Sequence, residues 1–139
     1  MPKEAQSPRS PRQPRNPSEP RSELSAAARK ARMAALVRQA RRAGRIVIGV
    51  RLNKAAAREG RVAAVLVAED LAAARRDALS ESWRAQGLPV YRGWSKDELG
   101  ELAGRPAVAV LGVSDRNIAA GLAQIEAVPA EDPGNRREE

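Results

Sequence analysis

The chain has no cysteine and no histidine among its 139 residues, and these absences exclude several common kinds of chemistry. It cannot form a disulfide, a thiolate zinc site or a cysteine nucleophile, and it has no imidazole base. Catalysis would have to rest on carboxylates, lysine, serine or the single tyrosine. We therefore expect a binding protein and not an enzyme, with no cofactor, no metal site and no small-molecule substrate.

Aromatic residues and long apolar runs are also scarce. Trp83, Tyr91 and Trp94 are the only aromatic residues, too few and too scattered for a platform on which single-stranded bases stack. We expect them to pack in the interior, with a single base stacked on Trp94 as the alternative. No apolar run approaches the roughly 20 residues of a membrane span, and the N-terminus lacks the apolar segment of a secretory signal. A cytoplasmic protein without a membrane partner is expected.

Acidic residues are almost absent from one part of the chain. Eleven of the 25 Lys and Arg residues lie between Ser25 and Arg61, where Glu59 is the only acid, so this segment has a formal charge of +10. Residues 1–24 carry +2 and residues 62–139 carry −4, within a total of +8. A positive charge confined to one part of a small fold is typical of a protein that binds a polyanion.

Composition divides the chain into three parts. Residues 1–24 are rich in proline, arginine and serine, and they have too few apolar side chains to offset the entropy lost on folding, so a disordered tail is predicted. Residues 129–139 are again polar and contain proline and glycine, which predicts a flexible C-terminal tail. Residues 25–128 are long enough to form one domain with its own core.

Helical and strand-like patterns alternate through residues 25–128. The spacing of Met33, Leu36, Val37 and Ala40 predicts a first helix over residues 25–43, ended by Gly44. Further helices are expected over residues 52–59, 70–86 and 96–103 and after Ser114 or Asp115, with strands over residues 45–48, 62–68, 88–91 and 107–111.

This alternation predicts an α/β fold, a three-layer α/β/α sandwich. The segments 62–68 and 107–111 are apolar on both faces, as in strands that helices cover on both sides. We expect a mostly parallel four-stranded sheet, with a mixed sheet as the alternative.

Two acidic residues, Glu69 and Asp70, follow the predicted strand 62–68 and could be taken for a metal-binding or phosphoacceptor pair. A capping role is simpler, because Asp70 stands where the next predicted helix needs an N-cap. No second acidic pair follows the first strand. We therefore interpret the pair as structural, and the alternative is an enzyme of nucleic-acid metabolism that depends on Glu69 or Asp70.

Gly49 lies between the first predicted strand and the helix that follows it. At such a junction a missing side chain lets a backbone approach a phosphate, and the free amides of a helix N-terminus can receive it. The basic residues around the junction are Arg45, Arg51, Lys54 and Arg58. Neither a dinucleotide-binding nor a Walker-type glycine motif is present, so the prediction is limited to phosphate contact.

Five short motifs occur together at a spacing that resembles a known family. They are ARRAGRIVIG at residues 40–49, VLVAED at 65–70, LPVY at 88–91, SKDELG at 95–100 and VSD at 113–115. In combination, over about residues 34–124, they resemble the ribosomal protein L7Ae/L30e superfamily, and most closely its bacterial YlxQ-type members. The resemblance implies the same α/β/α sandwich and the binding of structured RNA, either ribosomal or kink-turn-like, in a ribosome- or translation-associated role. Ribosomal proteins are possible further partners.

The resemblance also implies where RNA binds. The family's surface consists of the junction after the first strand, the start of the next helix, and an apolar loop before the last strand, which correspond to residues 49–54 and 104–108. The RNA-binding residues expected on this basis and on charge are Arg41, Arg42, Arg45, Gly49, Arg51, Lys54, Arg58, Arg105 and Pro106.

The junction differs from that of many kink-turn binders in one respect. They carry Gly-x-Asn-Glu, whose Asn and Glu read purine pairs, whereas this chain has Arg51 and Leu52 in the last two places, as YlxQ-type members also lack the Asn-Glu pair. Asn53 does not fit the register, because the step from Gly49 to Gly60 already matches the family spacing. Since Leu52 cannot accept hydrogen bonds from bases, we expect the protein to grip the RNA backbone. The alternative is that the protein is an interaction module, which either binds DNA non-specifically or docks on ribosomal proteins.

Overall fold

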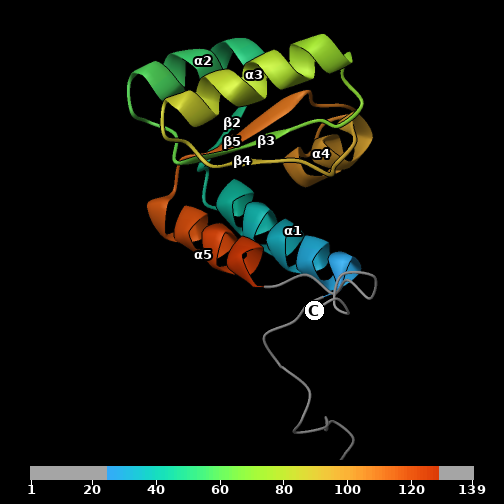
Figure 1. Cartoon of the computed structure of the whole chain (residues 1–139). Helices are drawn as coiled ribbons and strands as arrows, with labels where there is room; N and C mark the ends of the chain where they lie inside the picture. Colours follow the sequence, from blue (N-terminus) through green and yellow to red (C-terminus); the bar gives the residue numbers. More distant parts are fainter. Residues whose placement is uncertain (1–24, 129–139) are drawn as a thin grey trace, which may run out of the picture.

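The computed structural model describes residues 25–128, and in this part helices and strands alternate as predicted (Figure 1). The predicted tails, residues 1–24 and 129–139, lie outside the described residues. The elements are α1 (Ala26–Arg42), β2 (Ile46–Ile48), α2 (Val50–Arg58), β3 (Ala64–Val67), α3 (Ala73–Ala85), β4 (Val90–Tyr91), α4 (Lys96–Ala103), β5 (Val110–Val113) and α5 (Arg116–Ala127).

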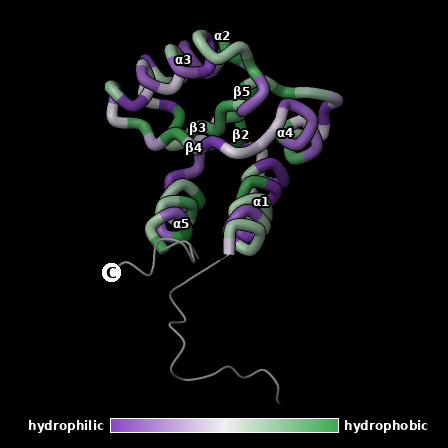
Figure 2. The backbone as a smooth tube through the Cα atoms, turned by 45° about the vertical axis from the view of Figure 1, so that its right-hand side comes forward, coloured by the Kyte–Doolittle hydropathy of each residue, from purple (hydrophilic) through white to green (hydrophobic). Residues whose placement is uncertain are grey.

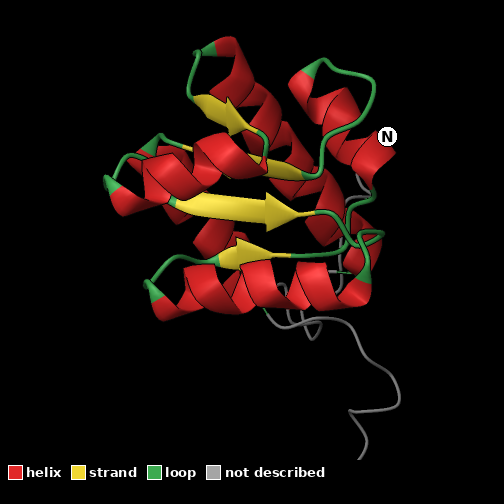
Figure 3. Ribbon diagram, turned by 90° about the horizontal axis from the view of Figure 1, so that it is seen from above, coloured by secondary structure: helices red, strands yellow, loops and turns green. Residues whose placement is uncertain are grey.

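The four strands form one sheet in the order β2-β5-β3-β4, seen side by side in Figure 3. The last strand in the sequence, β5, lies between β2 and β3 and runs antiparallel to both, and only β3 and β4 are parallel. The predicted α/β sandwich is therefore confirmed, but its sheet is mixed and not mostly parallel. The sequence pattern fixes which segments are strands, whereas their order and direction depend on long-range pairing.

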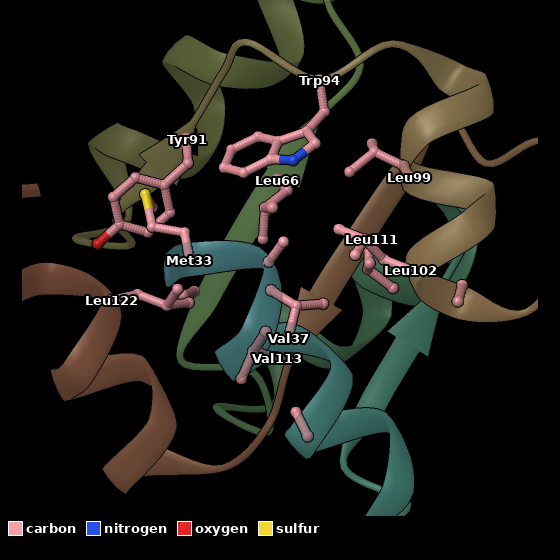
Figure 4. Close-up of a cluster of buried hydrophobic side chains, with 14 of the residues drawn as sticks. Met33, Val37, Leu66, Tyr91, Trp94, Leu99, Leu102, Leu111, Val113 and Leu122 are labelled. Atoms are coloured by element: carbon pink, nitrogen blue, oxygen red, sulfur yellow. The ribbon is translucent and has the colours of Figure 1, made fainter. Parts of the chain in front are cut away.

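Helices cover both faces of the sheet. In Figure 1, α2 and α3 lie on one face and α1 and α5 on the other, with α4 at the side. On the α1 side, Leu66 and Leu111 meet Met33 and Val37 of α1, as Figure 4 shows. Alternate residues of β3, such as Val65, point to the opposite face and pack with α3. The hydrophobic colouring of the strands in Figure 2 reflects this burial on two sides.

All three aromatic side chains belong to these cores. Trp83 is buried in the core beneath α3, and Tyr91 and Trp94 are buried in the core beneath α1. Trp94 is 4% exposed and directly precedes the capping box of α4, in which Ser95 Oγ accepts from the backbone N–H of Glu98 at 3.0 Å. The predicted packing role is confirmed, and Trp94 presents no face on which a base could stack.

The apolar face of α1 is covered by the sheet and by α4 and α5. The residues on this face, including Met33, Val37 and Ala40, are fully or almost fully buried. Among the helices of residues 25–128, none has both the length and the apolar composition of a membrane span.

Asp70 differs from the prediction. The third helix begins at Ala73, and its N-cap position is held by Ala72, which has no capping side chain. Asp70 Oδ1 instead accepts the backbone N–H of Lys96 at 2.9 Å. The carboxylate therefore caps α4, a helix distant in sequence, and sequence spacing alone could not identify that partner.

Glu69 also connects the loop after β3 to the segment between β4 and α4. Its carboxylate accepts hydrogen bonds from Nε and Nη2 of Arg92 at 3.1 and 3.0 Å and from the backbone N–H of Gly93 at 3.1 Å. The hydrogen bond with Arg92 is the main reason that the pKa of Glu69 lies below its usual value. Glu69 and Asp70 together fix the loop after β3 against the segment that leads into α4.

A buried amide fixes the turn from β2 into α2. Asn53 is 0% exposed, and its Nδ2 donates to the carbonyl oxygens of Val47 at 2.9 Å and Gly49 at 2.8 Å. Its Oδ1 has no hydrogen-bond partner among the described residues and lies against Gly112 of β5. A Cβ on Gly112 would stand 1.9 Å from that oxygen, so β5 can pass the amide only because residue 112 is glycine.

We expect Gly112→Ala to lower the free energy of unfolding by about 2 to 3 kcal/mol, because the methyl group must displace the Asn53 amide from both carbonyls. For a domain of this size the melting temperature should fall by about 10 °C or more. The matched control is Gly121→Ala in α5, where the added methyl group meets only the flexible end of Leu36. Equal melting temperatures for the two variants would contradict this role of Gly112.

We expect Glu69→Gln to lower stability by less than about 1 kcal/mol near pH 7, since the Glu69 carboxylate is partly exposed and screened. The pKa of Glu69 is lower in the folded than in the unfolded protein. The contribution of the Glu69 carboxylate to the free energy of unfolding is therefore present above the pKa of an unfolded glutamate, about 4.3. It is lost as the pH falls through the lower pKa of Glu69 in the folded protein. Chemical denaturation of both proteins should show a stability difference that shrinks with acidification. A difference that stays constant would contradict an ionic contribution.

Candidate nucleic-acid interface

One face of α2 carries a row of exposed basic side chains. Arg51, Lys54 and Arg58 are spaced i, i+3 and i+7, which places them on the same side of the helix, and all three are exposed. Leu52 beside them is 59% exposed, and it is the only large apolar side chain in residues 25–128 with such exposure. This surface can offer positive charge and one apolar contact.

The row begins at the N-terminus of α2, where Gly49 takes the N-cap position with φ 103°. Among the described residues no side chain caps this end, and none of their atoms beyond the chain neighbours of Gly49 lies within 4 Å of the place that its Cβ would occupy. The positive end of the helix dipole and its first N–H groups therefore open onto space beside Arg51, an arrangement that suits an anion.

The loop between α4 and β5 lies next to this junction. The backbone N–H of Gly49 donates to the carbonyl of Val110 at 2.9 Å, and Ile48 pairs with Leu111. Residues 49–54 and 104–108, far apart in the sequence, are therefore neighbours at the edge of the sheet. Arg105 and Pro106 are both exposed in this loop.

Two glycines of the α4 region let this loop pack closely. A Cβ on Gly100 would be 2.6 Å from the carbonyl oxygen of Arg105, so a side chain there would push the loop away from α4. A Cβ on Gly104, where φ is +77°, would be 2.5 Å from Nη2 of Arg41. Arg41 therefore lies directly over Gly104 and connects the end of α1 to the loop that holds Arg105.

The predicted contact residues separate into two groups by position. Gly49, Arg51 and Lys54 lie at the junction itself, and Arg41, Arg105 and Pro106 lie at the adjoining loop of residues 104–108. Arg45 lies at the other end of β2, where its carbonyl accepts from the N–H of Ser114, about 13 Å along the strand from Gly49. Arg42 is the last residue of α1, three positions before Arg45, and Arg58 is the last residue of α2. Both side chains are exposed. These three extend the basic surface beyond the junction.

Part of the positive charge counted in the sequence is used inside the domain. Arg29 donates to the carbonyls of Glu126 at 2.8 Å and Val128 at 2.6 Å, which caps the end of α5. Lys30 pairs with Glu98 at 3.0 Å, and Arg61 pairs with Glu59 at 2.6 Å. The other basic residues of this segment form no ion pair with the described residues: Arg32, Arg38, Arg41, Arg42, Arg45, Arg51, Lys54 and Arg58.

The acidic pair considered as a catalytic or metal site has structural contacts instead. Glu69 is bound by Arg92 and Gly93, and Asp70 caps α4. In the part of the chain that the structure describes, no three His, Cys, Asp or Glu side chains are grouped so that they could hold a metal ion. The structural interpretation of Glu69 and Asp70 is thus supported, although Asp70 caps a different helix from the one predicted.

Asn53 points away from this surface, because its amide is buried between β2 and β5. Sequence reasoning placed Asn53 outside the binding register but did not identify its structural role. It also missed the roles of Gly100 and Gly104. A glycine within a helix and one after it carry no local signal of the loop that packs against them.

Known proteins agree with this architecture. Residues 31–121 match the model of the ribosomal protein L7Ae/L30e/S12e/Gadd45 family. A solved Bacillus halodurans protein of unknown function has a TM-score of 0.64 and 25% sequence identity, with 69% of this chain and 98% of that one covered. A Giardia lamblia 15.5 kD RNA-binding protein has a TM-score of 0.62 and 18% identity, with 79% and 98% covered. No curated protein matches the chain.

The family match spans well over half of the chain, in the same region as the alternating elements, the Gly49 junction and the adjoining loop. The resemblance stated from the sequence motifs is therefore confirmed, and the chain belongs to the ribosomal protein L7Ae/L30e/S12e/Gadd45 family.

Proposed function

We propose that the protein binds structured RNA without catalysing a reaction on it. The observation that carries the proposal is the group of basic side chains around the open N-terminus of α2, next to the loop that contains Arg105, which have no acidic partner within residues 25–128. Two comparisons support RNA binding. The chain belongs to a family named for ribosomal proteins, and it shares its fold with a Giardia RNA-binding protein. The RNA is ribosomal or kink-turn-like, and ribosomal proteins are further partners in a cytoplasmic, translation-associated role.

The side chains at the junction favour contact with phosphates over the reading of bases. Arg51 can form a paired hydrogen bond to a phosphate, whereas exposed Leu52 offers only an apolar contact. Asn53 cannot replace the missing base-reading residue, because its amide holds two backbone carbonyls inside the fold. Recognition therefore rests on the shape and charge of a folded RNA, with the basic surface following its backbone.

The double substitution Arg51→Glu and Lys54→Glu should weaken RNA binding by at least about 30-fold, or ~2 kcal/mol, since two phosphate contacts become repulsive. The melting temperature should barely change, because both side chains are exposed. Titration of a fluorescent ribosomal RNA fragment would measure the affinity. The matched control, Arg75→Glu with Arg84→Glu on α3, makes the same change of charge elsewhere. An equal loss in the control would contradict a localised site.

RNA binding should weaken steeply with salt. The logarithm of the binding constant should fall by about 0.9 per phosphate neutralised for each unit of log salt, and the double substitution should reduce that slope by about 2. An affinity that does not change with salt would exclude the phosphate mechanism.

Competition between structured RNA and duplex DNA of equal length tests which class of nucleic acid the protein binds. Structured RNA should compete better, whereas equal competition would favour the alternative of non-specific DNA binding.

A further inference from the structure

The strand β2 has one unpaired edge. It lies at the end of the sheet that residues 25–128 form, and in this part of the chain β5 is its single neighbour. The carbonyl of Arg45 accepts from Ser114 and the N–H of Gly49 donates to Val110, both at 2.9 Å, so alternate residues from 45 to 49 face β5. The N–H and C=O groups of Ile46 and Ile48 therefore point away from the sheet. Within residues 25–128, nothing hydrogen-bonds these four groups.

A hollow of about 440 Å³ runs beside this edge. Its floor is the three residues of β2, and Leu52 of α2 adds an exposed apolar wall. Arg61 and Arg105 complete the lining. Arg61 precedes β3 near the Ile46 end, since Ala63 bonds Val113, the partner of Ile46. Arg105 precedes β5 near the Ile48 end, so an apolar strip has a cation at each end.

We propose that this edge of β2 binds an extended segment of an acidic partner protein, which adds to the sheet as a fifth strand. The outward groups of Ile46 and Ile48 would form main-chain hydrogen bonds with the segment, as in other cases of strand addition. The hollow beside Leu52 takes an apolar side chain of the segment. Carboxylates on either side of that residue meet Arg61 and Arg105.

Charge and geometry select this occupant. A second copy of the chain would bring Arg61 and Arg105 of one molecule against basic residues of the other, in a protein of net charge +8. An RNA strand could satisfy the two arginines, but it has no backbone that pairs with a strand edge. An acidic extended peptide satisfies the arginines, the apolar wall and the four backbone groups together. Arg61 is paired with Glu59 through Nε, but neither of its Nη groups is hydrogen-bonded to a described residue, so both can still donate to a partner carboxylate.

The proposal goes beyond RNA binding and can fail independently of it. Short synthetic peptides with alternating Val or Ile in the centre and Asp or Glu at both ends are titrated into the isotope-labelled full chain. Before addition, the amides of Ile46 and Ile48 should exchange with solvent faster than those of Val47 and Gly49. Peptide binding should slow the exchange of Ile46 and Ile48 by about tenfold or more.

Backbone methylation of the peptide separates strand addition from loose charge contact. N-methyl groups on the residues that face β2 should abolish binding, whereas the same groups on the alternate residues should leave it unchanged. Arg61→Glu should weaken binding several-fold, and the control Arg84→Glu on α3 should not.

Four results would overturn the proposal. They are the absence of binding by every peptide, equal effects of both methylation patterns, protection of Ile46 and Ile48 by self-association without peptide, and protection of these amides by an RNA hairpin but not by peptide. Loss of RNA binding in the Arg51 and Lys54 variant with peptide binding intact would show that peptide binding does not depend on these two RNA contacts, although Leu52 and Arg105 adjoin both surfaces.

Discussion

The Asn53 amide is the constraint on which the candidate surface depends. It holds the carbonyls of Val47 and Gly49, so the last residues of β2 and the first of α2 have one fixed relation. It also requires that β5 pass at Gly112 without a side chain. The same β5 strand begins directly after the loop of Arg105. A single buried side chain therefore sets where the open helix end lies relative to that loop.

Local chemistry explains the elements that the sequence predicted well. The helix of residues 26–42 follows from its apolar spacing, its Ser25 cap and the glycine after it, and α4 follows from its capping box. The burial of β3 on both sides follows from a segment without polar residues. These features depend on neighbours within a few positions, so they can be inferred without knowledge of the fold.

Features that depend on distant partners could not be predicted in this way. Asp70 was expected to cap the next helix in sequence, but the tertiary fold brings the N-terminus of α4 to it. The strand expected at residues 107–111 begins at Val110, because Val108 still bonds Lys96 at the start of α4. For the candidate site, the sequence indicated the charge and the Gly49 junction. It did not indicate that Arg29, Lys30 and Arg61 bind partners within the domain.

The contact of Arg29 with the end of α5 has a consequence for how the domain can be connected to other sequences. Because its guanidinium spans from the first turn of α1 to the carbonyls of Glu126 and Val128, both ends of the folded unit lie within one side chain's reach. In Figure 1 the first turn of α1 and the last turn of α5 lie on the side of the sheet opposite α2. Joining those ends would close only a short loop, at little entropic cost. The architecture is thus suited to circular permutation and to insertion as a module, with the basic face of α2 directed away from the point of attachment.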